Sequence, residues 1–148
     1  MSISILPGVD SSGSAIDAER MRLNVIANNI ANANTTRDVN GNTYKRQQVI
    51  FETVLAEETS KAGGNQQAPE SRMQVKVREI VDDPRPFKSI YMPGHPHADA
   101  QGMVQMPNVN VTEEMVDMIT ASRAIEANIQ AITTAKQMVQ RILDIGRR

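Results

Sequence analysis

The C-terminal part of the chain carries an apolar pattern with the period of a long α-helix, over about residues 111–145. Two rows of apolar residues recur there at heptad spacing: Met118, Ile125, Ile132 and Val139 in one row, and Met115, Ile129 and Leu143 in its partner row. At about 1.5 Å per residue, such a helix is roughly 50 Å long. A chain of 148 residues cannot enclose a helix of that length, so the pattern predicts burial against other chains.

The ends of this segment have the residues that begin and end helices. Asn110 is a suitable N-cap, and Glu113 stands three residues later to complete a capping box. Gly146 suits a C-terminal stop. A flank of small residues lies beside the apolar rows and would let further helices approach closely, so we predict that it faces adjacent subunits: Ala121, Ala124, Ala131 and Ala135.

A second helical pattern spans about residues 9–33. Its apolar residues keep heptad spacing and are predicted to pack on the C-terminal helix: Val9, Ile16, Leu23, Ile26 and Ile30. We expect Asp10, Ser11 or Ser12 to cap its start. An asparagine-rich stretch, Asn24–Asn34, costs helix stability, and its amides either fix the register of helix–helix contacts or belong to a frayed, exposed helix end.

The region between the two helices, residues 36–108, reads as loops and β-structure. Met73, Val75 and Val77 alternate with polar residues, which predicts a strand, and Ile80–Val81 breaks the alternation, which predicts a bulge or strand end. Residues 49–55 are a second candidate strand, and residues 60–70 read as a loop. The prolines of residues 84–107 favour an extended, turn-rich path without helix. The predicted fold class is α+β, with a helical arm at 1–35, a β-rich middle at 36–108 and a helical arm at 109–148.

Composition excludes several functions. The chain has no cysteine, so disulfides and thiol catalysis are excluded, and its net charge of −1 gives no reason to expect nucleic acid as a partner. The N-terminus lacks the basic and apolar regions of a cleaved secretion signal, and no apolar stretch approaches the length of a membrane span.

The strongest candidate for chemistry is the segment His95-Pro96-His97-Ala98-Asp99, whose two histidines and carboxylate are metal-ligand types. The familiar helical metal motifs place two histidines at i and i+4, and His95 and His97 lack this spacing. We therefore favour turn-building roles for this segment. The adjacent carboxylates Asp82–Asp83 are predicted to be solvated. With no nucleophile or phosphate-binding motif, we predict no enzyme activity, no metal and no cofactor.

Two separated blocks resemble the bacterial flagellar rod and hook family of axial proteins. The first block is Leu23–Thr35, and the second runs from Pro93 through Met106–Asn110 into the terminal helix, as in a short proximal-rod subunit. The motif residues are Asn28, Asn29, Ala31, Asn32 and Asn34 in the first block and Pro93, Gly94, Pro107 and Asn108 in the second.

The resemblance implies a structural subunit of the flagellar basal-body rod, in which terminal helices form a tube that transmits torque and encloses an export channel. It implies export through the flagellar type III apparatus without a cleaved signal, and a location in the rod that crosses the periplasm. The implied partners are copies of the chain itself, the other proximal and distal rod subunits, and the rod–ring adaptor. Because free subunits lack these neighbours, we expect their helical arms to be poorly ordered.

Two alternatives stay open at this point. A soluble helical adaptor could use the same apolar rows to pair with one other protein without polymerising. A metal-dependent enzyme would have to use His95, His97 and Asp99, for which the sequence supplies no accompanying nucleophile or base.

Overall fold

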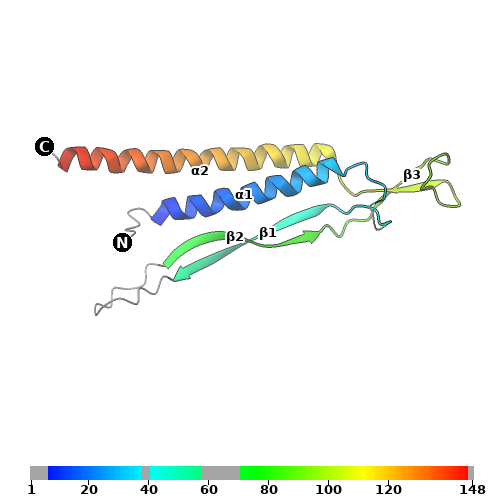
Figure 1. Cartoon of the computed structure of the whole chain (residues 1–148), viewed down its shortest axis with the longest axis horizontal. Helices are drawn as coiled ribbons and strands as arrows, with labels where there is room; N and C mark the ends of the chain where they lie inside the picture. Colours follow the sequence, from blue (N-terminus) through cyan, green and yellow to red (C-terminus); the bar gives the residue numbers. More distant parts are fainter. Residues whose placement is uncertain (1–6, 38–40, 58–70, 147–148) are drawn as a thin grey trace.

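The computed structural model describes residues 7–37, 41–57 and 71–146. The elements in chain order are α1 (Pro7–Ala31), β1 (Gln47–Glu57), β2 (Ser71–Asp82), β3 (Lys88–Tyr91), β4 (Met103–Met106) and α2 (Val111–Gly146). Figure 1 shows two long helices side by side with β-structure between them in the chain. The predicted α+β fold class is confirmed.

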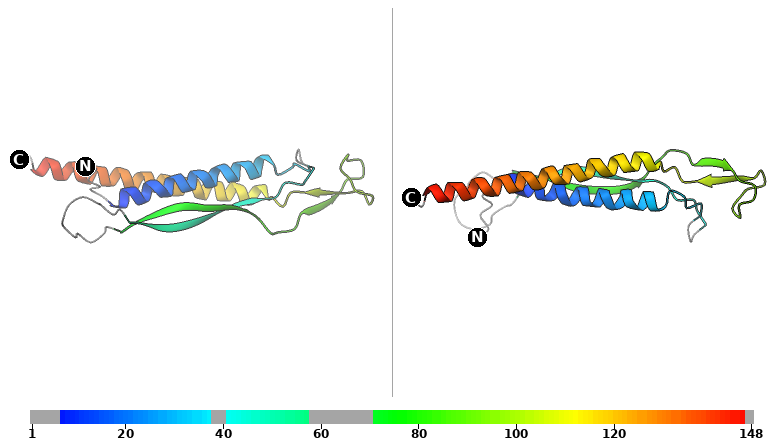
Figure 2. Two further views of the ribbon diagram at one scale, coloured as in Figure 1. Left: turned by 60° about the horizontal axis from the view of Figure 1, so that its bottom comes forward. Right: turned by 90° about the horizontal axis from the view of Figure 1, so that it is seen from above.

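The molecule is elongated and built in three layers. Helix α1 lies in the middle, because it packs against α2 on one side and against both strands of the β1–β2 hairpin on the other. The small β3–β4 hairpin extends from the end where α1 finishes and α2 begins (Figures 1 and 2). At the opposite end, α2 continues beyond the start of α1 in every view, so no other described helix lies beside its C-terminal part.

The helix ends match the prediction for α2 and correct it for α1. Asn110 caps α2, since its Oδ1 accepts from the backbone N–H of Thr112 at 3.1 Å and its side-chain amide donates to Glu113 at 3.1 Å. The predicted cap of the first helix is wrong: α1 already begins at Pro7, so Asp10, Ser11 and Ser12 lie inside it. A proline is tolerated in a first helical turn because it has no N–H to leave unpaired there.

The longer sheet is an antiparallel pair with one irregularity. β1 pairs with β2 from Gln47↔Asp82 to Glu57↔Ser71, and the register shifts between Ile50 and Phe51, which leaves Arg78 as an extra residue. This bulge lies two residues from the predicted break at Ile80, so that prediction is confirmed. The predicted loop at 60–70 lies outside the described residues.

The proline-rich segment follows the predicted extended path and also forms a short hairpin that the pattern did not indicate. β3 pairs with β4 from Lys88↔Met106 to Tyr91↔Met103. Gly102 in the connection has a φ of +76°, and a Cβ there would stand 2.9 Å from Tyr91 Cε2 and 3.1 Å from Pro93 Cβ. Both backbone conformation and space therefore require glycine at this turn.

Burial inside the chain is concentrated near the junction of the helices. The buried apolar residues are Ile16, Ala18, Val25, Ile26, Ala33, Val104, Val109 and Ala121. In α2, Glu114 and Ala121 are buried, and none of the described residues that follow Ala121 is. Neither described helix is long and apolar enough to cross a membrane.

Candidate functional site: a buried polar cluster

Five buried polar residues meet where the two helices join the hairpins, and we call them the polar cluster: Asn29, Arg46, Asp83, Asn108 and Glu114. They come from α1, from the residue before β1, from the residue after β2, from the loop before α2 and from the first turn of α2. Glu114 is 0% exposed and Asn29 is 1% exposed. Burying such groups is unfavourable unless each finds charged or hydrogen-bonding partners, so their pairing decides whether this junction is stable.

The Arg46 guanidinium is the centre of the cluster. Its Nε donates to Glu114 Oε1 at 2.6 Å, its Nη1 to Asp83 Oδ2 at 3.2 Å and its Nη2 to Asp117 Oδ2 at 3.3 Å. The Arg46 backbone takes part as well: its N–H donates to Asn108 Oδ1 and its carbonyl accepts from the Asp83 N–H, both at 2.7 Å. One residue thus binds α2, the end of β2 and the loop that leads into α2.

Asn29 joins α1 to the same cluster with a fully used amide. Its Nδ2 donates to the Gln47 carbonyl and to Glu114 Oε2, and its Oδ1 accepts from the Gln47 N–H and the Tyr44 hydroxyl, all at 2.9 Å. These four bonds use every donor and acceptor of the amide. Burial, with the nearby negative charges of Glu114 and Asp82, raises the pKa of the Tyr44 hydroxyl, which keeps it protonated as a donor.

Asp83 and Asn108 complete the buried part. Asn108 donates to the carbonyls of Asp83 and Arg85, and Asp83 accepts from Gln48, Arg46 and both the backbone and side chain of Arg85. Burial by itself would raise the pKa of the Asp83 carboxyl, but the hydrogen bonds from Arg85 and Arg46 outweigh it, and the pKa is lowered. Asp83 is therefore a carboxylate at neutral pH.

An outer pair extends the cluster to the surface. Arg85 Nη1 donates to Glu113 Oε2 at 3.2 Å. This bond, with the one from Asn110, lowers the pKa of the Glu113 carboxyl, while the bonds to Glu113 and Asp83 raise the pKa of Arg85. The whole arrangement consists of arginines paired with carboxylates. These pairs join α2, the end of β2 and the loop that leads into α2.

The cluster settles one open question of the sequence and corrects one prediction. Asn29 hydrogen-bonds Glu114 of α2, in line with the interpretation of a helix–helix contact. Asn24, Asn28 and Asn34 are exposed, but Asn24 and Asn28 lie within α1 and not at a frayed end. The predicted solvation of Asp83 is wrong, because it is buried by its partners. Arg46 was missed, since its carboxylate partners lie 37, 68 and 71 residues away in the chain and leave no local signal.

The predicted apolar rows are placed at different depths. Ile16 and Ile26 are buried; Val9, Leu23, Ile30, Met118, Ile125, Ile132 and Val139 are half-buried; Met115, Ile129 and Leu143 are exposed. The second row on the covered side of α2 is instead Glu114, Ala121, Asn128 and Ala135, which are buried or half-buried at heptad spacing. Ala121 is 0% exposed inside the single chain, so the prediction that it faces an adjacent subunit is wrong. Contacts of the exposed residues with other chains stay a prediction.

The histidine segment builds a turn. His95 Nδ1 accepts from the His97 N–H at 3.1 Å, His97 Nδ1 is 2.8 Å from Thr36 Oγ1, and Asp99 Oδ1 accepts from the N–H groups of Gln101 and Met103. Within residues 7–37, 41–57 and 71–146, no three histidine, cysteine or acidic residues are grouped as metal ligands.

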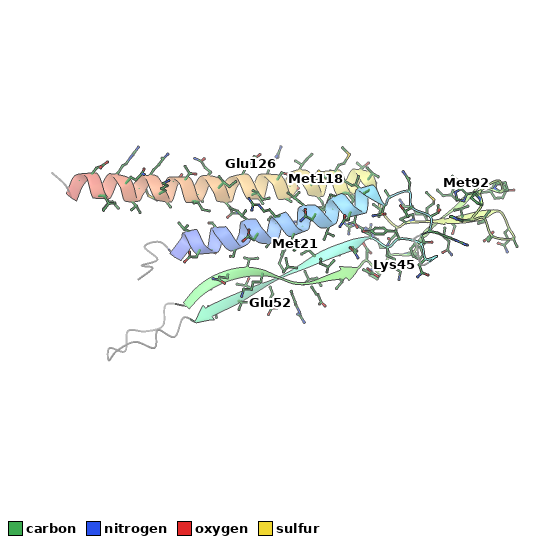
Figure 3. All side chains as sticks on the ribbon, in the orientation of Figure 1. Met21, Lys45, Glu52, Met92, Met118 and Glu126 are labelled. Carbon is green, nitrogen blue, oxygen red and sulfur yellow. The ribbon has the colours of Figure 1, made fainter. Side chains whose placement is uncertain are left out.

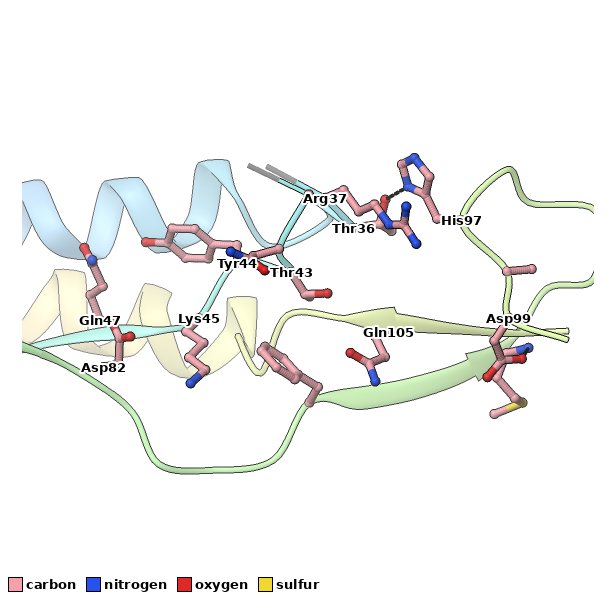
Figure 4. A pocket seen from close by; sticks show the side chains of 15 residues that line it. Thr36, Arg37, Thr43, Tyr44, Lys45, Gln47, Asp82, His97, Asp99 and Gln105 are labelled. Carbon is pink, nitrogen blue, oxygen red and sulfur yellow. Dashed lines mark hydrogen bonds between the residues drawn. The ribbon is translucent and has the colours of Figure 1, made fainter. Parts of the chain in front are cut away.

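A pocket of about 790 Å³ lies between this turn and the loop before β1 (Figure 4). Arg37 and Lys45 line it together with Asp82 and Asp99, and the Lys45 ammonium lies 5.9 Å from the centre of the Phe87 ring. Because two cationic and two anionic side chains line it, the pocket presents no dominant charge to a ligand.

Comparison with known proteins gives matches at both ends of the chain and along nearly all of it. Residues 10–37 match the model of the flagella basal body rod protein family, and residues 100–145 match the C-terminal model of the flagellar basal body rod FlgEFG proteins. The flagellar basal-body rod protein FlgC of Yersinia enterocolitica is 41% identical over 144 residues, covering 97% of this chain and 99% of that protein. The chain belongs to the FlgC family of flagellar basal-body rod proteins. It is therefore a structural rod subunit, and the resemblance seen in its sequence is confirmed.

Relatives in distant bacteria match almost as well. FlgC of Bacillus subtilis is 38% identical over 149 residues, covering 92% of this chain and 94% of that protein. FlgC of Borreliella burgdorferi is 37% identical over 147 residues, covering 95% and 97%.

The motif residues that point to the FlgC family divide between the polar cluster and the surface. Asn29, Pro107 and Asn108 are buried at the junction, and Asn32 is half-buried, where its amide donates back to the Asn28 carbonyl at the end of α1. The others are exposed: Asn28, Ala31, Asn34, Pro93 and Gly94. The buried motif residues pack or hydrogen-bond within this chain, whereas the exposed motif residues are accessible to solvent in the single subunit.

Replacing Asn29 by alanine should destabilise the free chain by about 1–3 kcal/mol, because Glu114, Gln47 and Tyr44 lose hydrogen-bond partners in a buried place. Asn28→Ala is the matched control on the same helix, and its cost should stay within about 0.5 kcal/mol because Asn28 is exposed. Urea unfolding followed by tyrosine fluorescence measures both. Equal costs for the two variants would contradict the assigned role of Asn29.

Acid should weaken the polar cluster through Asp83. Its folded-state pKa is lowered below the ordinary value of 3.8, so its contribution to stability is present above that value and is lost as the pH falls through the folded-state pKa. The free energy of unfolding should therefore fall as the pH drops below about 4. Asp83→Asn should be less stable at pH 7 and should show a shallower fall; an unchanged slope would refute this role.

Proposed function

We propose that this rod subunit polymerises through α1 and α2, with copies of itself and with other proximal and distal rod subunits, into a tube. The tube transmits motor torque and encloses the export channel. The observation that carries the proposal is the apolar surface of α2 that none of the described elements, within residues 7–37, 41–57 and 71–146, covers.

The C-terminal part of α2 exposes several large apolar side chains. Ile142 is 67% exposed and Ile145 is 76% exposed, with Met138 and Leu143 exposed beside them. Removing apolar surface from water is favourable by about 25 cal/mol per Å², so such residues gain stability when another chain covers them. Contiguous exposed apolar surface is characteristic of protein–protein interfaces. This end also projects beyond α1, where neighbouring helices can reach it (Figure 2).

The N-terminal half of α2 is uncovered on its outer sides as well. Met115, Val116 and Ile119 are all more than half exposed there, although Glu114 and Ala121, which flank them in the sequence, are buried against the chain. Figure 3 shows the side chains of α2 projecting outward along the side that α1 does not cover, Glu126 among them. Apolar groups on several sides of one helix favour burial by several neighbours, which suits a closed tube better than a single partner.

Torque has to pass between the helical layer and the hairpin layer of each subunit. The polar cluster supports this role, because charged contacts from Arg46 join α2 and the end of β2, and Asn29 joins α1 to α2 and to the start of β1. Charge-assisted hydrogen bonds have defined directions, so they resist sliding of one layer over another better than apolar contacts do.

We further infer export through the flagellar type III apparatus, a location in the part of the rod that crosses the periplasm, and contact with the rod–ring adaptor. Helical ends that are stable only beside neighbours would unfold readily for passage through a narrow channel. We also infer that the subunit is not an enzyme: the polar groups of the cluster are occupied by one another, which leaves them without a role toward a substrate.

Ile142→Asp should abolish rod assembly, because it places a charge where neighbouring helices are expected to bury an isoleucine. Gln140→Asp is the matched control: it introduces the same residue into the same exposed helix end without removing an apolar side chain. Each variant would replace the native subunit in cells, with swimming and purified basal bodies as readouts. Normal rods with Ile142→Asp would contradict the proposal. A purified subunit that pairs with one soluble protein and never polymerises would favour the adaptor alternative.

A further inference from the structure

We propose that copies of this chain also join through their strand edges: β3 of one copy adds to the open edge of β1 in the next copy. The two hairpins then form one antiparallel sheet in the order β2–β1–β3–β4 across two chains. The proposal rests on the proposed polymerisation and names a surface, separate from the helices, by which copies meet. An open strand edge presents unpaired N–H and carbonyl groups, and a strand of another chain can pair with them.

Helix α1 crosses the β1–β2 hairpin and covers a different strand edge at each end. Near the polar cluster, the Asn29 amide accepts from the Gln47 N–H and donates to the Gln47 carbonyl, so α1 covers the edge of β1 there. Near the start of α1, Ser14 Oγ accepts from the Val75 N–H at 3.1 Å, so α1 covers the edge of β2 there. Figure 1 shows β1 beside α1 at one end and β2 beside α1 at the other. The edge of β1 after Gln47 is therefore open.

The pairing of the strands shows which backbone groups lie on this open edge. Val75 is paired with Thr53, and the Val75 N–H points away from β1, so the Thr53 groups point away from β2. By alternation along β1, Val49 and Phe51 point the same way as Thr53. Among the described residues, no hydrogen bond from outside the hairpin reaches the backbone of residues 49–55.

The β3–β4 hairpin likewise has one covered edge and one open edge. The Met103 carbonyl accepts from the Asp99 N–H, and the Met103 N–H donates to Asp99 Oδ1, both at 2.9 Å, so the turn covers the edge of β4. Tyr91 is paired with Met103, so its backbone groups point to the opposite edge, that of β3. All four residues of β3 are exposed, and no described residue outside the hairpin hydrogen-bonds to their backbone.

The directions of the two open strands favour pairing of β1 with β3 of another copy. β1 leads from the junction toward the start of α1, whereas β3 leads away from the junction in the opposite direction (Figure 1). Two copies in the same orientation therefore bring these strands together antiparallel. This contact joins two different surfaces and repeats from copy to copy, as a polymer requires, whereas pairing of β1 with β1 would close a dimer.

One antiparallel register gives complementary side-chain pairs along the shared edge. It places opposite charges, two isoleucines, and an aromatic with a β-branched residue across from each other: Lys88 with Glu52, Ile90 with Ile50, and Tyr91 with Val49. Such cross-strand pairs stabilise antiparallel sheets. Ile50 is 38% exposed and Ile90 is 39% exposed in the single chain, so this register removes two apolar side chains from water.

A groove beside the open edge of β1 has room for Tyr91 of the next copy. The groove measures about 460 Å³ and is lined by Arg22 and Val25 of α1 and by Val49 and Phe51 of β1, among others. Tyr91 is 67% exposed in its own chain, and in this register its ring lies on the same face of the sheet as Val49 and Phe51. A tyrosine suits a groove with apolar walls and charged groups, because its ring is apolar and its hydroxyl is polar.

Disulfide crosslinking in assembled rods tests this pairing, because the chain has no cysteine of its own. Glu52→Cys with Lys88→Cys places two thiols directly opposite each other in the proposed register. After mild oxidation of purified basal bodies, this subunit should run as covalent dimers, trimers and larger multiples. The yield should be at least tenfold above that of Glu79→Cys with Lys88→Cys, the matched control, in which the first cysteine is equally exposed but lies on β2.

A second pair, Ile50→Cys with Ile90→Cys, tests the same register and should give the same multiples. No crosslinked multiples from either pair would overturn the inference; if these variants still form rods, the proposed polymerisation stands. Covalent dimers from Glu52→Cys alone or from Lys88→Cys alone would also overturn it, because they would show that like strands pair. Loss of rods with Ile142→Asp tests the helices and is independent of these outcomes.

Discussion

The pairing of one buried guanidinium with carboxylates from separate elements is the interaction on which the rest of this structure depends. Arg46 reaches Glu114 in α2 and Asp83 after β2, and Glu114 in turn reaches Asn29 in α1. A buried charge without partners is strongly unfavourable, so these elements have few ways to meet other than the observed one. The apolar contacts of the helices add stability, but the polar cluster determines their alignment.

This arrangement gives the subunit two kinds of helix surface. Near the polar cluster, α1 is enclosed between α2 and the β1–β2 hairpin. The buried polar groups of the cluster pair with one another there. Toward its C-terminus, α2 extends beyond the start of α1, and Ile142, Leu143 and Ile145 are exposed there. A subunit of the FlgC family needs a fixed internal geometry and also surfaces that other subunits cover. The polar cluster defines the geometry of the junction, and the exposed apolar side chains of α2 need neighbouring chains to bury them.

The sequence predicted much of the fold because helices and strands have local signatures. Asn110 and Glu113 predicted the start of α2, and the alternation at Met73–Val77 predicted β2. The cluster could not be predicted in this way, since Arg46 and Glu114 are 68 residues apart and neither is unusual among its neighbours in the chain. Periodicity also did not show which second row of α2 the chain covers. The pattern indicated Met115 and Ile129, whereas the covered row contains Glu114, Ala121 and Asn128. An apolar row on a helix shows that something covers it, but not whether that is its own chain or another.

A double-mutant cycle between Arg46 and Glu114 tests the central claim most directly. The free energies of unfolding of Arg46→Met, Glu114→Gln and the double variant would be measured by urea unfolding of the free subunit, with tyrosine fluorescence as the signal. If the ion pair organises the junction, the double variant should cost less than the sum of the single variants by about 1–3 kcal/mol. Additive costs would show that the two residues act independently and would contradict the account.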